Sequence, residues 1–127
     1  THMQYFAMGS LGNASVFGQF PGGARDSIAA ADNASRGVFS GSNESASAIS
    51  TEYVTIATTA SGAAFGSIYQ HYRGTAVSDG SRGVFTGGRW ASTLNNMEYI
   101  TISTTGNATD FGDLTSSQAT GGSASGS

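Results

Sequence analysis

Reactive side chains are scarce in this 127-residue sequence, which contains no cysteine and no lysine. Of its two histidines, His2 belongs to an opening Thr1-His2-Met3 that is typical of a cloning remnant or a processed end. His71 therefore has no cysteine, lysine or second histidine with which to form a nucleophile–base pair or a zinc site with the usual ligand spacing. From this scarcity we predict that the protein is not an enzyme.

Carboxylates are the remaining groups that could carry chemistry. Asp110 and Asp113 form the closest pair. Paired carboxylates hydrolyse glycosides, so glycan processing stays as the weakest alternative, because both residues adjoin a predicted strand. Asp32, Asp79 and Asp110 lie in turns rich in Asn, Gly and Ser, where oxygen ligands could bind calcium. Such side chains more often cap their own turn, so we expect no cofactor, with calcium as the alternative.

Two clusters combine aromatic rings with polar donors. Their members are Tyr69, His71, Tyr72 and Arg73 in the first cluster, and Arg89, Trp90, Asn95 and Asn96 in the second. Aromatic faces flanked by amide and guanidinium groups can hold sugars by stacking and directed hydrogen bonds. Trp, Tyr and Arg are equally enriched at subunit contacts. We keep both interpretations open, a glycan site and a packing contact.

A repeat of 46 residues must position these clusters. The string SRGVF at 35–39 recurs at 81–85, the Glu-Tyr-containing segment at 52–56 recurs at 98–102, and Phe65-Gly66 recurs as Phe111-Gly112. A half-length copy opens the chain, because Tyr5 precedes Phe17 by the same twelve residues that separate the later Tyr and Phe pairs. A period of about 40–50 residues with several short strands is typical of propellers and solenoids.

The predicted fold class is all-β, with no segment that requires a helix. Alternation of apolar residues and threonine at 52–58 is the clearest strand pattern. The other strands are expected at 4–9, 17–20, 27–31, 37–41, 65–68, 74–77, 83–87, 99–104 and 111–114. We divide the single domain, 1–127, into a half repeat with an inner-strand segment (4–34), two repeats (35–80 and 81–115) and a Gly/Ser-rich tail (116–127).

Residues that recur in each copy are interpreted as structural, since an active site is seldom duplicated in every repeat. Arg36 and Arg82 accompany Glu52 and Glu98 at equivalent positions. We predict that each arginine pairs with the glutamate of its own repeat and so links neighbouring strands. The recurring aromatic residues, Phe65 and Phe111 together with Phe17, are predicted to pack between repeats.

The sequence resembles kelch-type propeller repeats in three stretches, RGVFTGG at 82–88, EYITI at 98–102 and FGDLT at 111–115. In that family a di-glycine ends the second strand of each four-stranded blade and a large aromatic residue begins the fourth. More closely, the combined motif resembles repeat arrays in virion proteins of tailed phages, cyanophages among them. Two departures are Gly41-Ser42 in place of a di-glycine and phenylalanine in place of tryptophan. The resemblance implies a location on a virion or another extracellular surface.

The resemblance also implies a need for partners, because two and a half blades cannot close a ring that requires about 4–8, and open blades expose strand edges. We therefore predict that the chain is its own partner in a homo-oligomeric ring. Each half blade would be completed by a neighbour's C-terminal tail, and three chains would give six blades. An open helical filament is the alternative when the rotation between copies does not close.

Charge and hydropathy exclude other partners. The net charge is −3 and the five arginines are dispersed, which leaves no basic stripe for nucleic acid. No apolar run approaches the ~20 residues of a membrane span. We expect a non-catalytic structural or adhesion protein. The alternative is a lectin for cell-surface glycans, with a site on each blade or at each subunit junction.

Overall fold

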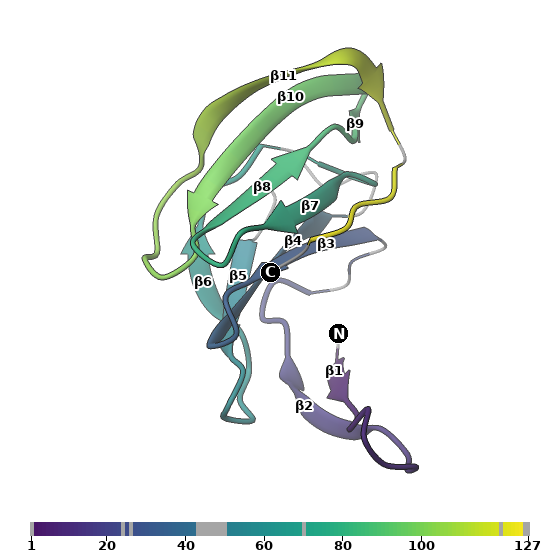
Figure 1. Ribbon diagram of the computed structural model, residues 1–127, viewed down its shortest axis with the longest axis vertical. Coiled ribbons are helices and arrows are strands. Elements are labelled where there is room, and N and C mark those ends of the chain that lie inside the picture. Colours follow the sequence, from purple (N-terminus) through teal and green to yellow (C-terminus); the bar gives the residue numbers. More distant parts are fainter. Residues whose placement is uncertain are drawn as a thin grey trace.

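The computed structural model describes residues 2–23, 25, 27–42, 51–69, 71–119 and 121–125 (Figure 1). These residues form eleven β-strands and contain no helix, which confirms the predicted all-β class. The strands make three antiparallel sheets that follow one another along the chain. Sheet 1 is a hairpin of β1 (His2–Tyr5) and β2 (Ser15–Gln19). A closed ring of sheets is not present within the described chain.

Sheets 2 and 3 are four-stranded meanders of the same design. Sheet 2 has the order β3 (Ser27–Asp32), β4 (Arg36–Ser42), β5 (Thr51–Thr55) and β6 (Ala63–Gly66). Sheet 3 has the order β7 (Thr75–Ser78), β8 (Arg82–Thr86), β10 (Ser92–Thr101) and β11 (Thr109–Gln118), with the short β9 (Arg89–Trp90) paired to β10. The 46-residue repeat of the sequence thus corresponds to one sheet, and sheet 1 supplies only the last two strands of the pattern.

A β-bulge marks the last strand of all three sheets. In each sheet the pairing register skips the recurring phenylalanine, which is Phe17, Phe65 or Phe111. A bulge leaves the extra residue outside the hydrogen-bond ladder and increases the local twist. The phenylalanine backbone is therefore free to bond to something other than its own sheet.

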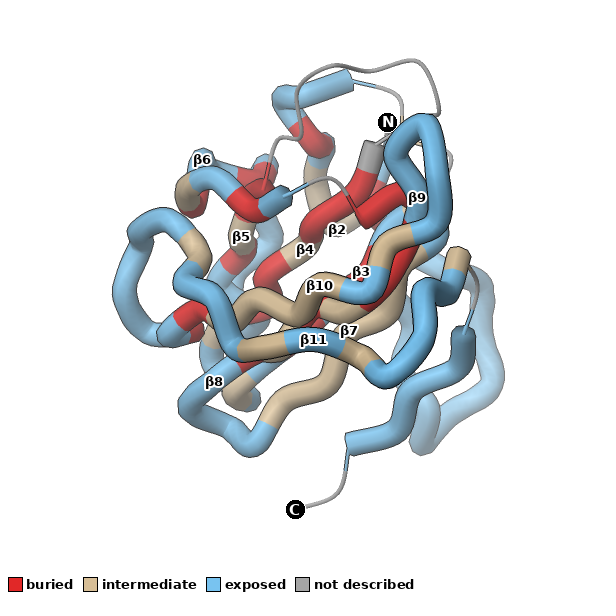
Figure 2. The backbone as a smooth tube through the Cα atoms, turned by 90° about the horizontal axis from the view of Figure 1, so that it is seen from above, coloured by how far each residue is buried: buried red, intermediate tan, exposed pale blue. Residues whose placement is uncertain are grey.

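Two apolar clusters hold the sheets face to face. The larger cluster lies between sheets 2 and 3 and consists of Ala29, Ala31, Val38, Phe65, Ile68, Phe85, Ile100 and Ile102. The smaller one lies between sheets 1 and 2 and consists of Met3, Phe20 and Val54. Figure 2 shows buried residues concentrated in β4 and β5, whereas much of β11 is exposed. The stack is therefore well covered in its middle and open at the face beyond sheet 3.

Sheet 3 differs from the predicted strands at both of its last members. β10 begins at Ser92, within the stretch expected to be a polar connection, and β11 continues to Gln118, into the predicted tail. The extension forms because Leu94 pairs with Gln118, whose carbonyl also accepts the backbone N–H of Gly88 at 2.7 Å. The counterpart of this connection in the preceding repeat, at 43–50, lies outside the described residues.

The C-terminal segment lies along β7. Ser123 Oγ donates to the Ala76 carbonyl at 2.7 Å, and Ser78 N–H donates to Ser125 Oγ at 2.9 Å. Both contacts join residues 47 apart, close to the repeat length. β7 itself lies beside β3 in the same way, since Arg73 N–H donates to Ser27 Oγ, 46 residues earlier. The segment thus occupies the place where a further first strand would follow the pattern.

Candidate functional site

The two polar–aromatic clusters predicted from the sequence meet at one end of sheet 3. Arg89 N–H donates to the Tyr72 carbonyl at 2.8 Å, which forms an isolated β-bridge. Gly87 and Gly88, with φ of 60° and 100°, make this crossing possible. A Cβ on Gly88 would lie 2.8 Å from the Cα of His71. The di-glycine is therefore required for the close approach of the two segments.

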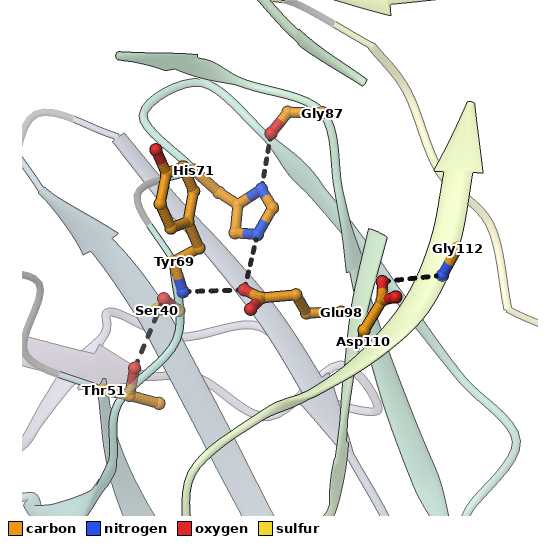
Figure 3. A network of polar contacts seen from close by, with 8 residues as sticks. All are labelled: Ser40, Thr51, Tyr69, His71, Gly87, Glu98, Asp110 and Gly112. Atoms are coloured by element: carbon orange, nitrogen blue, oxygen red, sulfur yellow. Dashed lines mark hydrogen bonds and ion pairs between the residues drawn. The ribbon is translucent and has the colours of Figure 1, made fainter. Parts of the chain in front are cut away.

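His71 is buried at the base of this cluster and is held from both sides of its ring. Nδ1 bonds to the Gly87 carbonyl, and Nε2 lies 3.4 Å from Glu98 Oε2 (Figure 3). The same carboxylate accepts the backbone N–H of Tyr69 at 2.7 Å. A carbonyl only accepts, so Nδ1 donates to it, and Nε2 faces the carboxylate on the other side of the ring. His71 is thus buried and tied to the fold through both ring nitrogens.

An equivalent pair stands 46 residues earlier in sheet 2. Arg25 Nη2 lies 3.1 Å from Glu52 Oε2, and the two side chains are only 2% and 5% exposed. Burial lowers the pKa of Arg25, and the charge of Glu52 partly offsets that effect. Glu52 Oε1 also accepts the backbone N–H of Gly22 at 2.7 Å. Each glutamate therefore fastens the segment that enters its sheet to the third strand of that sheet.

The predicted pairs of Arg36 with Glu52 and of Arg82 with Glu98 are wrong. The strand register places Glu52 opposite Phe39 and Glu98 opposite Phe85, three residues along from the arginines. Arg36 instead stacks on Tyr53, with 4.1 Å between Cζ and the ring centroid. Arg82 stacks on Tyr99 in the same way, at 5.0 Å. These are cation–π contacts within one sheet, and the real partners of the glutamates were missed because one is an arginine and the other a histidine.

The recurring phenylalanines differ in burial. Phe65 is 3% exposed between sheets 2 and 3, as predicted. Phe111 is 49% exposed, because the described chain has no sheet beyond it. Both rings make the same edge-to-face contact with a tyrosine of the third strand, with centroids 6.2 Å apart for Tyr53 and Phe65 and 6.1 Å for Tyr99 and Phe111. The two repeats thus share this aromatic pair, and the difference in burial comes from the sheet that covers Phe65 and not Phe111.

The exposed part of the cluster presents two rings, Tyr69 and Trp90. Tyr72 is buried beneath the guanidinium of Arg73, whose Cζ lies 5.0 Å from the ring centroid. Arg89 and Asn95 are exposed, whereas Asn96 is half-buried. The cavity that adjoins them, lined by residues such as Arg73, Gly87 and Gln118, measures about 20 Å³, which is room for one water. Among the described residues, this end of the sheet offers two exposed rings for stacking beside a cavity of this small size.

The turn carboxylates act as caps. Asp79 Oδ1 accepts the backbone N–H groups of Ser81 and Arg82 at 2.8 and 2.7 Å. These two bonds, with Arg82 first, lower the pKa of Asp79. Asp32 and Asp110 each accept one backbone N–H from two residues onward, as the sequence predicted. The described residues contain no group of three or more His, Asp or Glu that could hold a metal ion.

Two apolar grooves lie along the stack, one on its open face and one between two of its sheets. One has about 390 Å³ and lies on the open face of sheet 3, where Val77, Val84 and Phe111 line it together with the C-terminal segment. The other has about 360 Å³ and lies between sheets 1 and 2. Its lining consists of Met3, Gln4, Phe17, Phe20, Ile28, Ala30, Phe39, Val54 and Ile56. Beyond it, the β1–β2 turn exposes Phe6, Met8 and Leu11.

No protein-family model matches the chain, and no curated protein matches it significantly. Within the described residues, no helix is long and apolar enough to cross a membrane.

Proposed function

We propose that the chain is a non-catalytic, self-assembling module of the propeller type. Sheets 2 and 3 are two of its blades and sheet 1 is the outer half of another. Copies join end to end into a ring or a filament that acts as a structural or adhesion component. One observation carries this proposal: a sheet-to-sheet contact occurs twice in the chain, with Phe20 and Val54 buried between sheets 1 and 2 as their counterparts Ile68 and Ile100 are between sheets 2 and 3. The unused halves of this contact are the outer side of sheet 3, which exposes Phe111, and the β1–β2 hairpin, which exposes Phe6 and Met8. They lie at opposite ends of the molecule (Figure 1).

The unused halves correspond residue by residue to the interface that is already formed. Ile102 of sheet 3 is fully buried against sheet 2, whereas Met8 at the corresponding position of sheet 1 is 94% exposed. Ile100 is buried in the same way, and its counterpart Phe6 is exposed. On the opposite face, buried Phe65 corresponds to exposed Phe111. The apolar side chains that are buried in the formed contact should also be buried when the contact is repeated between two copies. Each Å² of apolar surface removed from water would stabilise the assembly by about 25 cal/mol.

The interface is heterologous, since the face beyond sheet 3 meets the face before sheet 1. Head-to-tail contacts of this kind form a ring when the rotation closes and a filament when it does not. Two complete blades and one completed half blade give three blades per copy, so two copies would make a ring of six, within the usual range of about 4–8, and three copies a ring of nine. Sequence resemblance to tailed-phage virion repeats is the only support for a place on a phage-like particle.

The chemistry of the described side chains supports a structural role. His71 is bonded to a backbone carbonyl and to Glu98. Glu52 is ion-paired with Arg25 and accepts a backbone N–H, and Asp110 caps its own bulge. His71, Glu52 and Asp110, three groups that the sequence offers for acid–base work, therefore each have a partner within the fold.

Light scattering after size-exclusion chromatography tests this proposal. The expected result is a discrete multiple of the 12.8 kDa chain. A trimer would have 3 × 12.8 = 38.4 kDa, and polydisperse larger species would indicate a filament. A folded 12.8 kDa monomer at concentrations up to the millimolar range would refute self-assembly.

Glycan binding is the second candidate, favoured by the exposed rings of Tyr69 and Trp90 beside Arg89 and Asn95. Trp90→Ala separates the two functions. A lectin should lose retention on a glycan array while its solution mass stays unchanged. Loss of the oligomer in Trp90→Ala would instead assign the ring to a contact between copies.

A further inference from the structure

A turn of one sheet is hydrogen-bonded to the bulged strand of the preceding sheet, and we call this contact the grip. Between sheets 3 and 2, Gly106 N–H donates to the Phe65 carbonyl and Ala108 N–H donates to the Ser67 carbonyl, both at 2.9 Å. Asn107 Oδ1 accepts the N–H of Ser67 at 3.0 Å. Three hydrogen bonds therefore link one tripeptide to the backbone at a single bulge.

The same grip recurs between sheets 2 and 1. Gly62 N–H donates to the Gln19 carbonyl at 2.8 Å, and Ser61 Oγ accepts the N–H of Gln19 at 3.3 Å. In both places the middle residue of the turn accepts through its side chain and the third residue donates from its backbone. The contact is thus a repeated feature of the fold that tolerates either Ser or Asn at its centre.

A glycine beneath each grip makes room for it. A Cβ on Gly66 would lie 2.0 Å from the Gly106 carbonyl oxygen, and one on Gly18 would lie 2.1 Å from that of Ala60. Gly112 is the corresponding residue of β11, and there the nearest atom within 4 Å is Met97 Cε, at 3.8 Å. β11 therefore has the bulge and the glycine of a gripped strand, yet no described residue grips it.

The matching turn lies at the other end of the molecule. Gly12-Asn13-Ala14 repeats the residues of Gly106-Asn107-Ala108 and stands at the same place in its hairpin. The whole stretch is exposed, and nothing lies within 4 Å of where a Cβ on Gly12 would be. Figure 1 shows this turn and β11 at opposite ends of the chain, so one molecule cannot join them.

We propose that Gly12-Asn13-Ala14 of one copy grips β11 of the next copy. By analogy with the formed contacts, Asn13 Oδ1 accepts the N–H of Asp113 and Ala14 N–H donates to the Asp113 carbonyl. Gly12 N–H donates to the Phe111 carbonyl. The exposed Phe6 then covers the exposed ring of Phe111. This inference rests on the proposed self-assembly and defines the register in which copies meet.

A second copy is the occupant because both halves of the contact are present in this chain. The turn matches one that is already engaged, in identity and in position within its hairpin. β11 matches β2 and β6, which already make this contact, because the pairing register skips its phenylalanine and a glycine follows that residue. The apolar residues beside each half, Met8 and Phe111, are exposed.

Engineered disulfides test the register, since the chain has no cysteine of its own. The test variant is Asn13→Cys with Asp113→Cys in the full chain. The matched positive control is Asn107→Cys with Ser67→Cys, which bridges the corresponding contact inside one molecule. The matched negative control is Asn13→Cys with Ser116→Cys, three residues along the same exposed strand. Each variant is oxidised, run on a non-reducing gel and digested for mass spectrometry of the linked peptides.

We expect the positive control to close within one chain and the test variant to form dimers and higher multiples through the 13–113 link. The negative control should give less than a tenth of that linkage. Equal linkage in the test and negative variants would refute the register. An oligomer by light scattering without the 13–113 link would refute this inference and leave self-assembly standing. A monomer without the link would overturn both.

Discussion

Gly66→Ala is a direct test of how closely sheets 2 and 3 approach each other. The new Cβ would lie 2.0 Å from the Gly106 carbonyl oxygen, and ordinary contact begins at 3.4 Å. The obstacle is backbone and cannot rotate away, so the turn has to move by 3.4 − 2.0 = 1.4 Å. The predicted consequence is a loss of stability without a change of fold.

Its size follows from the bonds that this movement breaks. The three hydrogen bonds of the turn, at 2.9, 2.9 and 3.0 Å, would lengthen by the same 1.4 Å, beyond the ~3.2 Å limit of such bonds. At about 0.5–1.5 kcal/mol each, their loss lowers the free energy of unfolding by about 3 kcal/mol.

Urea unfolding followed by tyrosine and tryptophan fluorescence measures this free energy. The matched control is Gly106→Ala on the other side of the same contact, where a Cβ would meet nothing within 4 Å. We expect this control to raise stability by about 0.4–1 kcal/mol, because alanine restricts the unfolded chain. If Gly66→Ala and Gly106→Ala unfold within about 0.5 kcal/mol of each other, the close approach argued from Gly66, and with it the inference about Gly112, is wrong.

Two further predictions concern charge. Glu52→Ala should lower the free energy of unfolding by about 3–5 kcal/mol in the same assay, because it leaves buried Arg25 without its counter-ion; Glu52→Ala with Arg25→Met should recover part of the loss, and no recovery would contradict the pairing. Asp79 has a lowered pKa, so its contribution to stability is complete above the ordinary aspartate pKa of about 3.9 and is lost as the pH falls through the folded-state value. Asp79→Asn, which keeps an accepting oxygen as Asn33 does, should flatten the dependence of the urea midpoint on pH below about pH 4; an unchanged slope would argue against the cap.

Much of the fold could be predicted because the same residues recur at the same spacing in each copy, which shows where equivalent strands lie. The all-β class and the assignment of one sheet to each 46-residue copy followed from recurring Tyr and Phe residues at a fixed spacing. The ends of β10 and β11 could not be predicted in this way, because they depend on Leu94 pairing with Gln118 across a turn that has no counterpart in the sequence pattern. Strand length there is decided by tertiary contact and not by local propensity.

The sequence singled out the residues of the two clusters, and it did not predict the bonds that hold them in place. The clusters around Tyr72 and Arg89 do meet, since the di-glycine between their segments signals a close approach. The partners of the glutamates were missed because a comparison of the copies finds only residue types that recur. The structure instead repeats a contact to the glutamate, which a different residue type makes in each copy. Arg25 and His71 differ in type and yet hold Glu52 and Glu98 in the same way.

This distinction explains why the stack can be extended. The contacts that join one sheet to the next are made largely by backbone N–H and carbonyl groups at a bulge and a turn, so they do not depend on which side chains a given copy carries. What they do require is a glycine at one position, because any Cβ there would meet backbone at about 2 Å. Gly112 keeps a glycine on the open side of sheet 3 with no described turn above it, and its φ of 131° itself calls for glycine. Gly18 and Gly66 have no such φ, so in them the glycine is explained by the approach of the turn alone. What β11 shares with the two earlier last strands is therefore the skipped phenylalanine and the open space above its glycine, and these two features are what a following turn needs.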